Sequence, residues 1–508
     1  MAITSRLDAP AGMREALVLG LPAVIGTVAL LVVARKGVYA SPDSAFYVGT
    51  ARNLLDGHGL TAPPGSPPLS HFPPLFPLLL AAVAWVTRLD PLDAAGLVNA
   101  VLLGATAFLV AVVVRRRSGS VTLGVVASVA VVVAVDLLVY FGSALSEPLF
   151  VVLVLGAMVA LAAAVEDQNR RWAWVGAAVL TAGACLTRYV GVALVMAAVV
   201  VLVVDGGRRW GRAAAFAAAS LAPLAVWLAA AGRGNRPVTV HLFGADYWTD
   251  GVRSLSRWVL PPFVPWPVRG AALALAVAGV VGLARSAPHP PVTEPARGRP
   301  DPFGLLLVVF SAAYLVVLVI DRILLDATGR LDLRFLTVLH VVAIVGLVPW
   351  LHRTVGGRAR AAATVVGLAL ITLHGVQAGS WVVAGLSDTD LGRRGLTAAA
   401  WRDSPVMAAI EALPPDVTVY SNAPEAIFLH TGRATSALPA VTDYLSGRMR
   451  PSYEAELAAM EDRLVRDGAV VVWFRPYAFR RQFLAPVDHL DVEPVLQDEV
   501  ATLSTVRR

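Results

Sequence analysis

The sequence is poor in charged residues, and it contains a single cysteine and a single lysine. Charged residues make up 15% of the 508 positions, against 57% hydrophobic residues, and this balance excludes an ordinary soluble globular protein. With Cys185 alone, the chain forms no intramolecular disulfide. Lys36 stands among many arginines, a composition typical of a GC-rich bacterial genome.

The hydrophobic residues are concentrated in about eleven runs that are almost free of charge. Each run is close to the length that a helix needs to cross a hydrocarbon core of about 30 Å. The pattern predicts an all-α polytopic domain of the plasma membrane over residues 1–384, with about 11 transmembrane helices; ten or twelve remain possible. The runs lie near 17–34, 93–114, 121–140, 148–165, 172–187, 189–204, 213–231, 267–285, 303–320, 335–351 and 361–384.

Arginine clusters between these runs predict the orientation of the chain, because basic loops stay in the cytoplasm. All the clusters fall on one side if segment 73–89, which is short and begins Pro-Pro, is a juxtamembrane or re-entrant helix. The N-terminus is then cytoplasmic, and a first outer loop at 35–92 faces outside. The net charge of +7 is explained by these clusters, so nucleic acid is not expected as a partner. The clusters lie at 115–117, 170–171, 208–212, 285–299 and 353–360.

Residues 385–508 differ from the rest because charges occur throughout and helical and strand patterns alternate. They predict a small extracytoplasmic α/β domain that serves as a lid or recognises the acceptor. This part contains no Gly-rich phosphate loop, zinc-ligand spacing or nucleophile elbow. Helices are predicted at 405–413 and 453–466, and strands at 417–420 and 469–474.

Asp43 is the first acidic residue of the outer loop and precedes an amphipathic stretch at 44–55. It can therefore cap an interfacial helix. A carboxylate held in a partly desolvated cleft at the membrane surface can also act as a general base toward a substrate hydroxyl. Both interpretations are open from the residues alone.

Several short stretches at predicted outer ends of the spans occur in a recognisable order. Asp43 and Tyr47 are followed by Ala-Arg-Asn-Leu-Leu-Asp-Gly-His-Gly-Leu at 51–60 and Pro-Pro-Leu-Phe-Pro at 73–77, then by Ser-Glu-Pro-Leu-Phe at 146–150, Thr-Arg-Tyr-Val-Gly at 187–191 and Asp-Leu-Arg-Phe at 332–335. This order resembles the GT-C membrane glycosyltransferases that use polyprenyl-phosphate sugars. The likeness is greatest to the family 39 type, with its protein mannosyltransferases and aminoarabinose transferases.

The resemblance implies a reaction and a set of roles. A sugar would pass, with inversion, from a polyprenyl-phosphate donor to a hydroxyl of a glycan, lipid or protein acceptor at the outer face, with Asp43 as general base. Arg188 and Arg334 would hold the donor phosphate, because guanidinium groups bind phosphate bidentately; snorkelling at the interface is their alternative. The expected substrate-binding residues are Tyr47, His58, His71, Glu147 and Tyr189.

Two departures from the family pattern concern metal binding. Many members carry a second acid beside the first-loop aspartate, where this chain has Ser44, and metal-dependent relatives use an Asp-x-Asp pair that is absent here. No metal or other cofactor is therefore expected.

Two other classes of protein share a many-span architecture. A lipid-linked sugar transporter should show repeated halves and charges along a path through the membrane, whereas Asp136 is one of few charges inside the predicted spans. A non-enzymatic accessory protein of cell-envelope assembly would leave Asp43 without a role.

Overall fold

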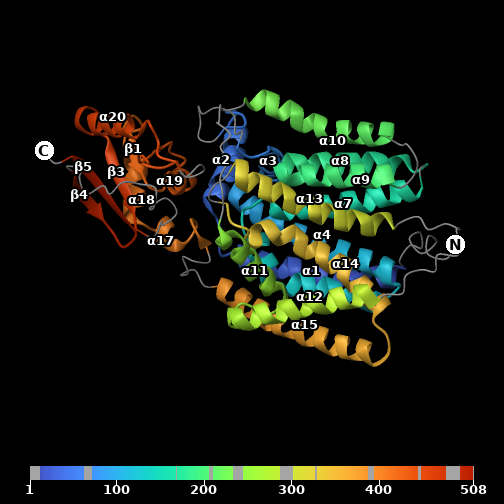
Figure 1. Ribbon diagram of the computed structural model, residues 1–508. Coiled ribbons are helices and arrows are strands. Elements are labelled where there is room, and N and C mark those ends of the chain that lie inside the picture. Colours follow the sequence, from blue (N-terminus) through green and yellow to red (C-terminus); the bar gives the residue numbers. More distant parts are fainter. Residues whose placement is uncertain are drawn as a thin grey trace.

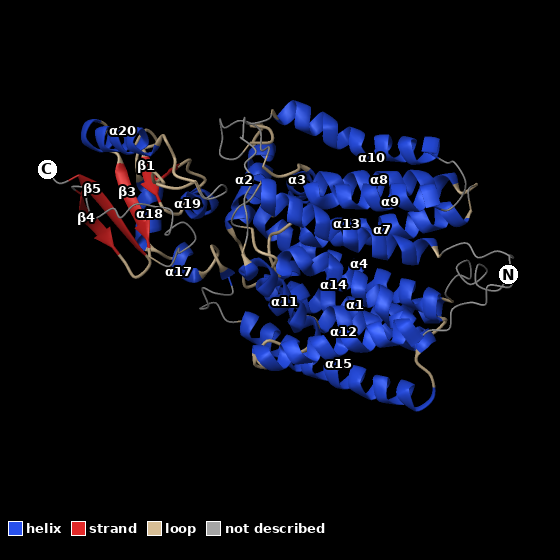
Figure 2. Ribbon diagram, in the orientation of Figure 1, coloured by secondary structure: helices blue, strands red, loops and turns tan. Residues whose placement is uncertain are grey.

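A computed structural model describes residues 12–61, 71–167, 169–204, 210–232, 244–286, 301–325, 329–386, 394–443, 448–475 and 492–506. Long helices lie side by side in a bundle, and a smaller domain with a β-sheet adjoins one end of it (Figures 1 and 2). The start of α1 (Met13–Ala34) lies at the opposite end of the bundle. The predicted all-α membrane domain with a small C-terminal α/β domain is thus confirmed.

The remaining helices of the bundle follow in chain order. They are α4 (Pro91–Ser118), α5 (Val121–Val133), α6 (Val135–Phe141), α7 (Glu147–Glu166), α8 (Arg171–Thr187), the 3-10 turn η2 (Tyr189–Gly191), α9 (Val192–Val204), α10 (Trp210–Ala231), α11 (Ala245–Val259), α12 (Trp266–Ser286), α13 (Pro302–Leu324), α14 (Leu333–Thr354) and α15 (Gly357–Gly385).

Each of the predicted apolar runs is helical, but not all are long, straight spans. Within the described residues, eight helices are long and apolar enough to cross a membrane. The run at 121–140 is broken into α5 and α6, which are bent by 63°, and would be the ninth. The run at 172–187 is α8, of 17 residues, and the run at 189–204 is a shorter apolar helix.

Several helices begin at side chains that satisfy free backbone N–H groups. Asp90 accepts a hydrogen bond from Leu92 N at 2.9 Å at the start of α4, and Ser120 accepts one from Leu123 N at the start of α5. Such caps replace the hydrogen bonds that the first turn of a helix lacks. They fix where α4 and α5 begin.

Two short helices, α2 (Pro42–Leu55) and α3 (Leu75–Thr87), belong to the segment predicted as the first outer loop. They lie at the end of the bundle that faces the C-terminal domain (Figure 1). At 1.5 Å per residue α3 is about 20 Å long, too short to cross a hydrocarbon core of about 30 Å. This length fits the predicted juxtamembrane helix.

The C-terminal domain is built on a five-stranded sheet of order β2-β1-β3-β5-β4. The strand β1 (Val419–Ser421) pairs in parallel with β2 (Ser436–Ala437) and β3 (Val470–Phe474), and β5 (Ala501–Val506) pairs antiparallel with β3 and β4 (Val492–Gln497). Its helices are α17 (Ala399–Arg402), α18 (Pro405–Ala412), α19 (Pro424–Thr431) and α20 (Tyr453–Arg466).

The C-terminal domain and α2 share one hydrophobic core. Val48 and Ala51 of α2 are buried in the same cluster as Ile427 of α19. At Gly49 the backbone of α2 meets the Phe428 ring, because a Cβ added there would lie 2.0 Å from Phe428 Cε1. The domain is therefore packed directly on the segment that carries Asp43.

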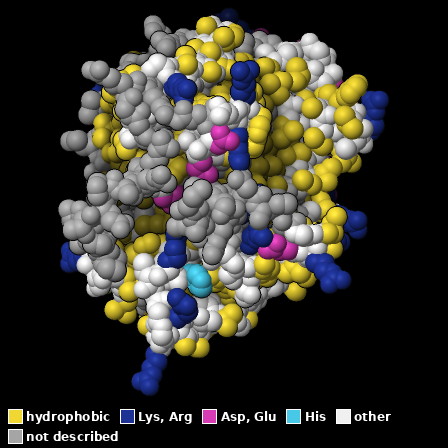
Figure 3. Space-filling model, turned by 90° about the vertical axis from the view of Figure 1, so that its right-hand side faces the viewer, with side chains coloured by type: hydrophobic (Ala, Val, Ile, Leu, Met, Phe, Trp, Pro, Cys, Tyr) yellow, Lys and Arg dark blue, Asp and Glu magenta, His cyan; other side chains and the backbone are white. Residues whose placement is uncertain are grey.

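The opposite end of the bundle carries many of the arginine clusters. Arg115 of α4 pairs with Glu15 of α1 at 2.6 Å, and Arg117 pairs with Asp301 just before α13. The view onto this end shows dark blue side chains spread over its rim (Figure 3). The pairs of Arg115 and Arg117 and the C-terminal domain thus lie at opposite ends, as the positive-inside argument requires, whereas most of the cluster at 285–299 and part of that at 208–212 lie outside the described residues.

Candidate active site

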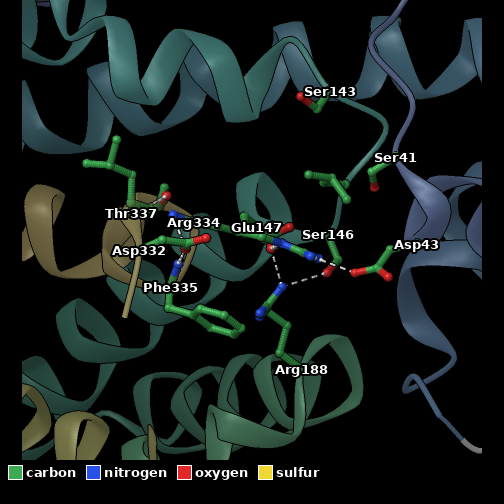
Figure 4. Close-up of polar contacts among 12 residues, drawn as sticks. Ser41, Asp43, Ser143, Ser146, Glu147, Arg188, Asp332, Arg334, Phe335 and Thr337 are labelled. Carbon is green, nitrogen blue, oxygen red and sulfur yellow. Dashed lines mark hydrogen bonds and ion pairs between the residues drawn. The ribbon is translucent and has the colours of Figure 1, made fainter. Parts of the chain in front are cut away.

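Four charged side chains meet near the boundary between the bundle and the C-terminal domain (Figure 4). Asp43 Oδ2 lies 2.6 Å from Arg334 Nη1, and Arg334 Nε donates to Glu147 Oε1. Arg188 Nη1 lies 2.5 Å from the same Glu147 oxygen. Four separate elements, α2, α7, α14 and the end of α8, therefore bring their charges to one place.

The position of Asp43 follows from the start of α2. Ser41 is the N-cap, and Ser41 and Ser44 each accept a hydrogen bond from the other's backbone N–H, a capping box. The interpretation of Asp43 as the cap is therefore wrong, because Ser41 has already taken that role. Asp43 stands in the first turn, and its carboxylate reaches Arg334.

Arg334 and Arg188 are placed by the ends of their helices. Asp332 caps α14 by accepting hydrogen bonds from Arg334 N at 2.9 Å and Phe335 N at 3.4 Å. Arg188 ends α8 with an extended backbone, at φ −148° and ψ 135°. The two guanidinium groups then approach Glu147 from different helices.

Glu147 has no cationic neighbour in the sequence, yet two arginines contact it in space. Its side chain is 4% exposed, and its Oε2 has no hydrogen-bond partner within the described residues. Its Oε1 bridges Arg188 and Arg334, and the expected role of Glu147 in substrate binding stays a prediction. Two like charges can lie so close because the carboxylate stands between them.

Asp43 and Glu147 together balance the charges of Arg188 and Arg334. Arg188 is 11% exposed and Arg334 22% exposed at their side chains, so water screens the pairs only partly. Interfacial snorkelling accounts for neither residue, because both guanidinium groups bind carboxylates inside the protein.

Tyr47 is buried beside this charged group. Its hydroxyl lies 3.2 Å from Ser146 Oγ, which also accepts a 3.4 Å hydrogen bond from Arg188 Nη1. Burial raises the pKa of Tyr47, and the nearby Asp43 carboxylate raises it further, so the phenol stays protonated at neutral pH. Tyr47 therefore ties α2 to α7 as a neutral hydrogen-bonding group.

The other three expected substrate-binding residues lie outside the charged group. His58 is exposed just beyond α2. His71 is also exposed and packs edge-on against Phe72, with ring centroids 4.5 Å apart. Tyr189 is half-buried in η2 and packs against a small apolar cluster that includes Leu224.

Several residues of the site were not singled out from the sequence. Ser146, Asp332 and Phe335 stand inside the short stretches that carried the family resemblance, which was the available signal. The Arg188 guanidinium lies 5.7 Å from the centroid of the Phe335 ring, and Tyr314 donates to the Phe335 carbonyl at 2.8 Å. Phe335 thus forms an apolar wall beside the charges.

A shallow depression in the surface lies next to this wall, between α11, α13 and α14. Tyr247, Asp321, Arg322, Leu331 and Phe335 line it. Within the described residues, no group of three or more His, Cys, Asp or Glu side chains could hold a metal ion.

Comparison with known proteins gives a consistent pattern. Residues 71–230 match the family described as dolichyl-phosphate-mannose-protein mannosyltransferase. No curated protein matches the chain significantly by sequence. The solved structure of ArnT from Cupriavidus metallidurans, bound to undecaprenyl phosphate, is 14% identical with a TM-score of 0.58, and the alignment covers 95% of this chain and 97% of that one.

Two further solved structures share the fold. AglB, the archaeal oligosaccharyltransferase from Archaeoglobus fulgidus, has a TM-score of 0.51 at 13% identity, over 89% of this chain and 69% of that one. The arabinofuranosyltransferase AftD from Mycobacteria has a TM-score of 0.50 at 17% identity, over 96% of this chain and 40% of that one. The chain therefore matches the protein mannosyltransferase family over residues 71–230, and along nearly its whole length it shares the fold of ArnT, a fold also seen in AglB and AftD.

Proposed function

We propose that the protein transfers a sugar from a polyprenyl-phosphate donor to an acceptor hydroxyl at the outer face of the membrane, with inversion and with Asp43 as general base. The observation that carries the proposal is the position of Asp43, which lies 2.6 Å from Arg334 beside the C-terminal domain. A carboxylate in this position can meet a hydroxyl from the aqueous side and a lipid-linked donor from the membrane side.

The proposed reaction is a single displacement. Asp43 accepts the proton of the acceptor hydroxyl while the hydroxyl oxygen attacks the anomeric carbon from the face opposite the phosphate. The bond between that carbon and the phosphate oxygen breaks, and its electron pair leaves with the polyprenyl phosphate. Because this leaving group is stable as an anion at neutral pH, no general acid is needed.

Arg188 and Arg334 are proposed to hold the donor phosphate. Both are already paired with carboxylates, so a phosphate must compete with Asp43 for Arg334. Phosphate binding would then draw Arg334 away from Asp43 and leave the carboxylate free to accept a proton. The base would thus become available only when the donor is in place.

The proposed orientation puts the N-terminus in the cytoplasm and the C-terminal domain outside. The donor lipid would be a bacterial polyprenyl phosphate, a class that includes the undecaprenyl phosphate bound in the ArnT structure.

The test is a transfer assay with the purified full-length protein in proteoliposomes. A polyprenyl-phosphate sugar labelled in the sugar is supplied with envelope extract as a source of acceptor. Label in a product that resists mild acid, with equimolar release of polyprenyl phosphate, is the expected result. Movement of intact labelled lipid between leaflets without such a product would instead identify a transporter. If neither transfer nor movement of lipid occurs, the protein is an accessory protein.

A further inference from the structure

A second group of charged residues, separate from the Asp43 group, is formed by Asp136, Arg257 and Arg269. Asp136, at the start of α6, is buried, and its Oδ1 lies 2.7 Å from Nη2 of Arg257 on α11. Arg269, in the first turn of α12, is close enough to interact electrostatically with both residues. Three helices thus share a charged site that the proposed transfer does not use.

Arg269 is placed unusually for a charged residue. It is the one buried residue of α12, a helix that the structure describes throughout, and it is 9% exposed. The rest of α12 is apolar and largely uncovered, as expected for a helix facing lipid. The helix therefore turns its arginine, and not an apolar residue, toward the protein.

The two arginines keep hydrogen-bond donors that no other described residue satisfies. Nε and Nη1 of Arg269 and Nε of Arg257 are buried without an acceptor. Asp136 is the one carboxylate among the electrostatic neighbours of Arg269, and it already pairs with Arg257. Two positive charges against one negative charge leave an excess of one positive charge.

A buried guanidinium without a counter-charge is costly, so a further anion is expected to complete the site. Phosphate oxygens suit guanidinium donors well, since several can bind one phosphate group at the same time. Arg257 keeps 30% of its side chain exposed, which leaves an approach to the site beside α11.

The surroundings favour a phosphate that belongs to a lipid. Trp266 begins α12 and is 43% exposed, and the Arg253 guanidinium lies 5.3 Å from the centroid of its ring. Exposed tryptophan beside arginine marks the level of lipid headgroups. A lipid lying along the uncovered face of α12 would bring its phosphate to this level.

We propose that Arg257 and Arg269 bind the phosphate group of a membrane lipid, at a site additional to the one proposed for the donor. Asp136 holds Arg257 in place and competes with the phosphate for it. This inference requires only that the protein lies in a membrane, so it stands or falls separately from the role of Asp43.

The experiment measures binding of phosphatidylglycerol to the purified full-length protein in a neutral detergent, by native mass spectrometry across a lipid titration. Diacylglycerol, which has no phosphate, is the reference ligand. We expect Arg269→Gln to weaken phosphatidylglycerol binding by about tenfold or more, from the loss of charge-assisted hydrogen bonds. Arg269→Lys, which keeps the charge, should bind with intermediate strength and serves if the glutamine variant fails to fold.

Arg285→Gln is the matched control, because Arg285 is an exposed arginine at the other end of the same helix. Arg285→Gln should bind phosphatidylglycerol as the unmodified protein does. The proposal is overturned if Arg269→Gln and Arg269→Lys both bind phosphatidylglycerol like the unmodified protein, or if Arg285→Gln loses as much binding. Binding of inorganic phosphate at millimolar concentration, without any preference for phosphatidylglycerol over diacylglycerol, would overturn the assignment to a lipid.

Discussion

Arg334 Nη1 lies 2.6 Å from Asp43 Oδ2 and, through its Nε, also donates to Glu147. A single guanidinium group from the first turn of α14 thus joins a carboxylate at the start of α2 to one buried in the bundle. Only a planar group with several donors can make both contacts in this geometry.

Replacing this arginine should impair transfer even when the positive charge is kept. In Arg334→Lys one ammonium cannot replace both contacts, and we expect kcat/KM for the donor to fall by about 100-fold. Steady-state kinetics at varied donor concentration measure the change. Arg466→Lys, on α20 and with 75% of its side chain exposed, should leave the kinetics unaltered. Equal losses in both variants would contradict a specific role for Arg334.

Glu147 is expected to matter for stability as well as for transfer. Glu147→Gln removes the charge between two buried arginines, and breaking a buried ion pair typically costs about 3 kcal/mol or more. The Tm of the detergent-solubilised protein should fall by several degrees. Asp167→Asn, at the end of the same helix, removes an exposed pair with Arg170 and should change the Tm little. If the Tm of Glu147→Gln equals that of the unmodified protein, the ion pairs of Glu147 make no net contribution to the free energy of unfolding.

The contact between Gly49 and Phe428 predicts that α2 tolerates no side chain at this position. Gly49→Val would push the ring away and weaken the packing of the C-terminal domain on α2, at a cost of about 1–3 kcal/mol. Limited proteolysis should then release C-terminal fragments faster. Gly279→Val is the control, since a Cβ at Gly279 meets no atom within 4 Å. Unchanged proteolysis of Gly49→Val would show that the ring moves at no cost.

Acid should destabilise the C-terminal domain through protonation of His430. Its Nε2 lies 2.6 Å from the Leu396 carbonyl, and burial lowers the pKa of this histidine below its ordinary value. Since the unfolded chain binds a proton more readily, the stability that neutral His430 provides is present above about pH 6.5 and is lost as the pH falls through the folded pKa. The Tm should therefore decrease from pH 7 to pH 5, and less steeply in His430→Gln. Equal slopes in the two proteins would exclude His430 as the cause.

The sequence predicted the helices well because apolar length is a local property, and runs such as 93–114 and 361–384 became α4 and α15. It also named Asp43, as the first acid after the first apolar run, and Arg188, Arg334 and Glu147, each at the end of an apolar run, with roles that came from the family resemblance. It did not predict their pairing, because Glu147 meets its arginines only when α7, α8 and α14 pack together.

Two other features of the structure could not be predicted from the sequence, because they also depend on contacts between residues. Ser41, and not Asp43, is the N-cap of α2, because Ser41 and Ser44 form a reciprocal pair of hydrogen bonds. The proline before Asp43 does not reveal this pair in the sequence. Arg257 and Arg269 were not singled out in the sequence. Only packing shows that Arg269 points inward from a helix that is otherwise uncovered.

The role of Asp43 is tested most directly by single-turnover release of polyprenyl phosphate from a polyprenyl-phosphate sugar in proteoliposomes with acceptor present. Asp43→Asn is compared with Asp56→Asn, an exposed residue just beyond the same helix. The account predicts that Asp43→Asn slows release by about 100-fold or more, the usual effect of losing a general base, while Asp56→Asn does not. Release by Asp43→Asn at the rate of the unmodified protein, with donor saturating, would contradict it.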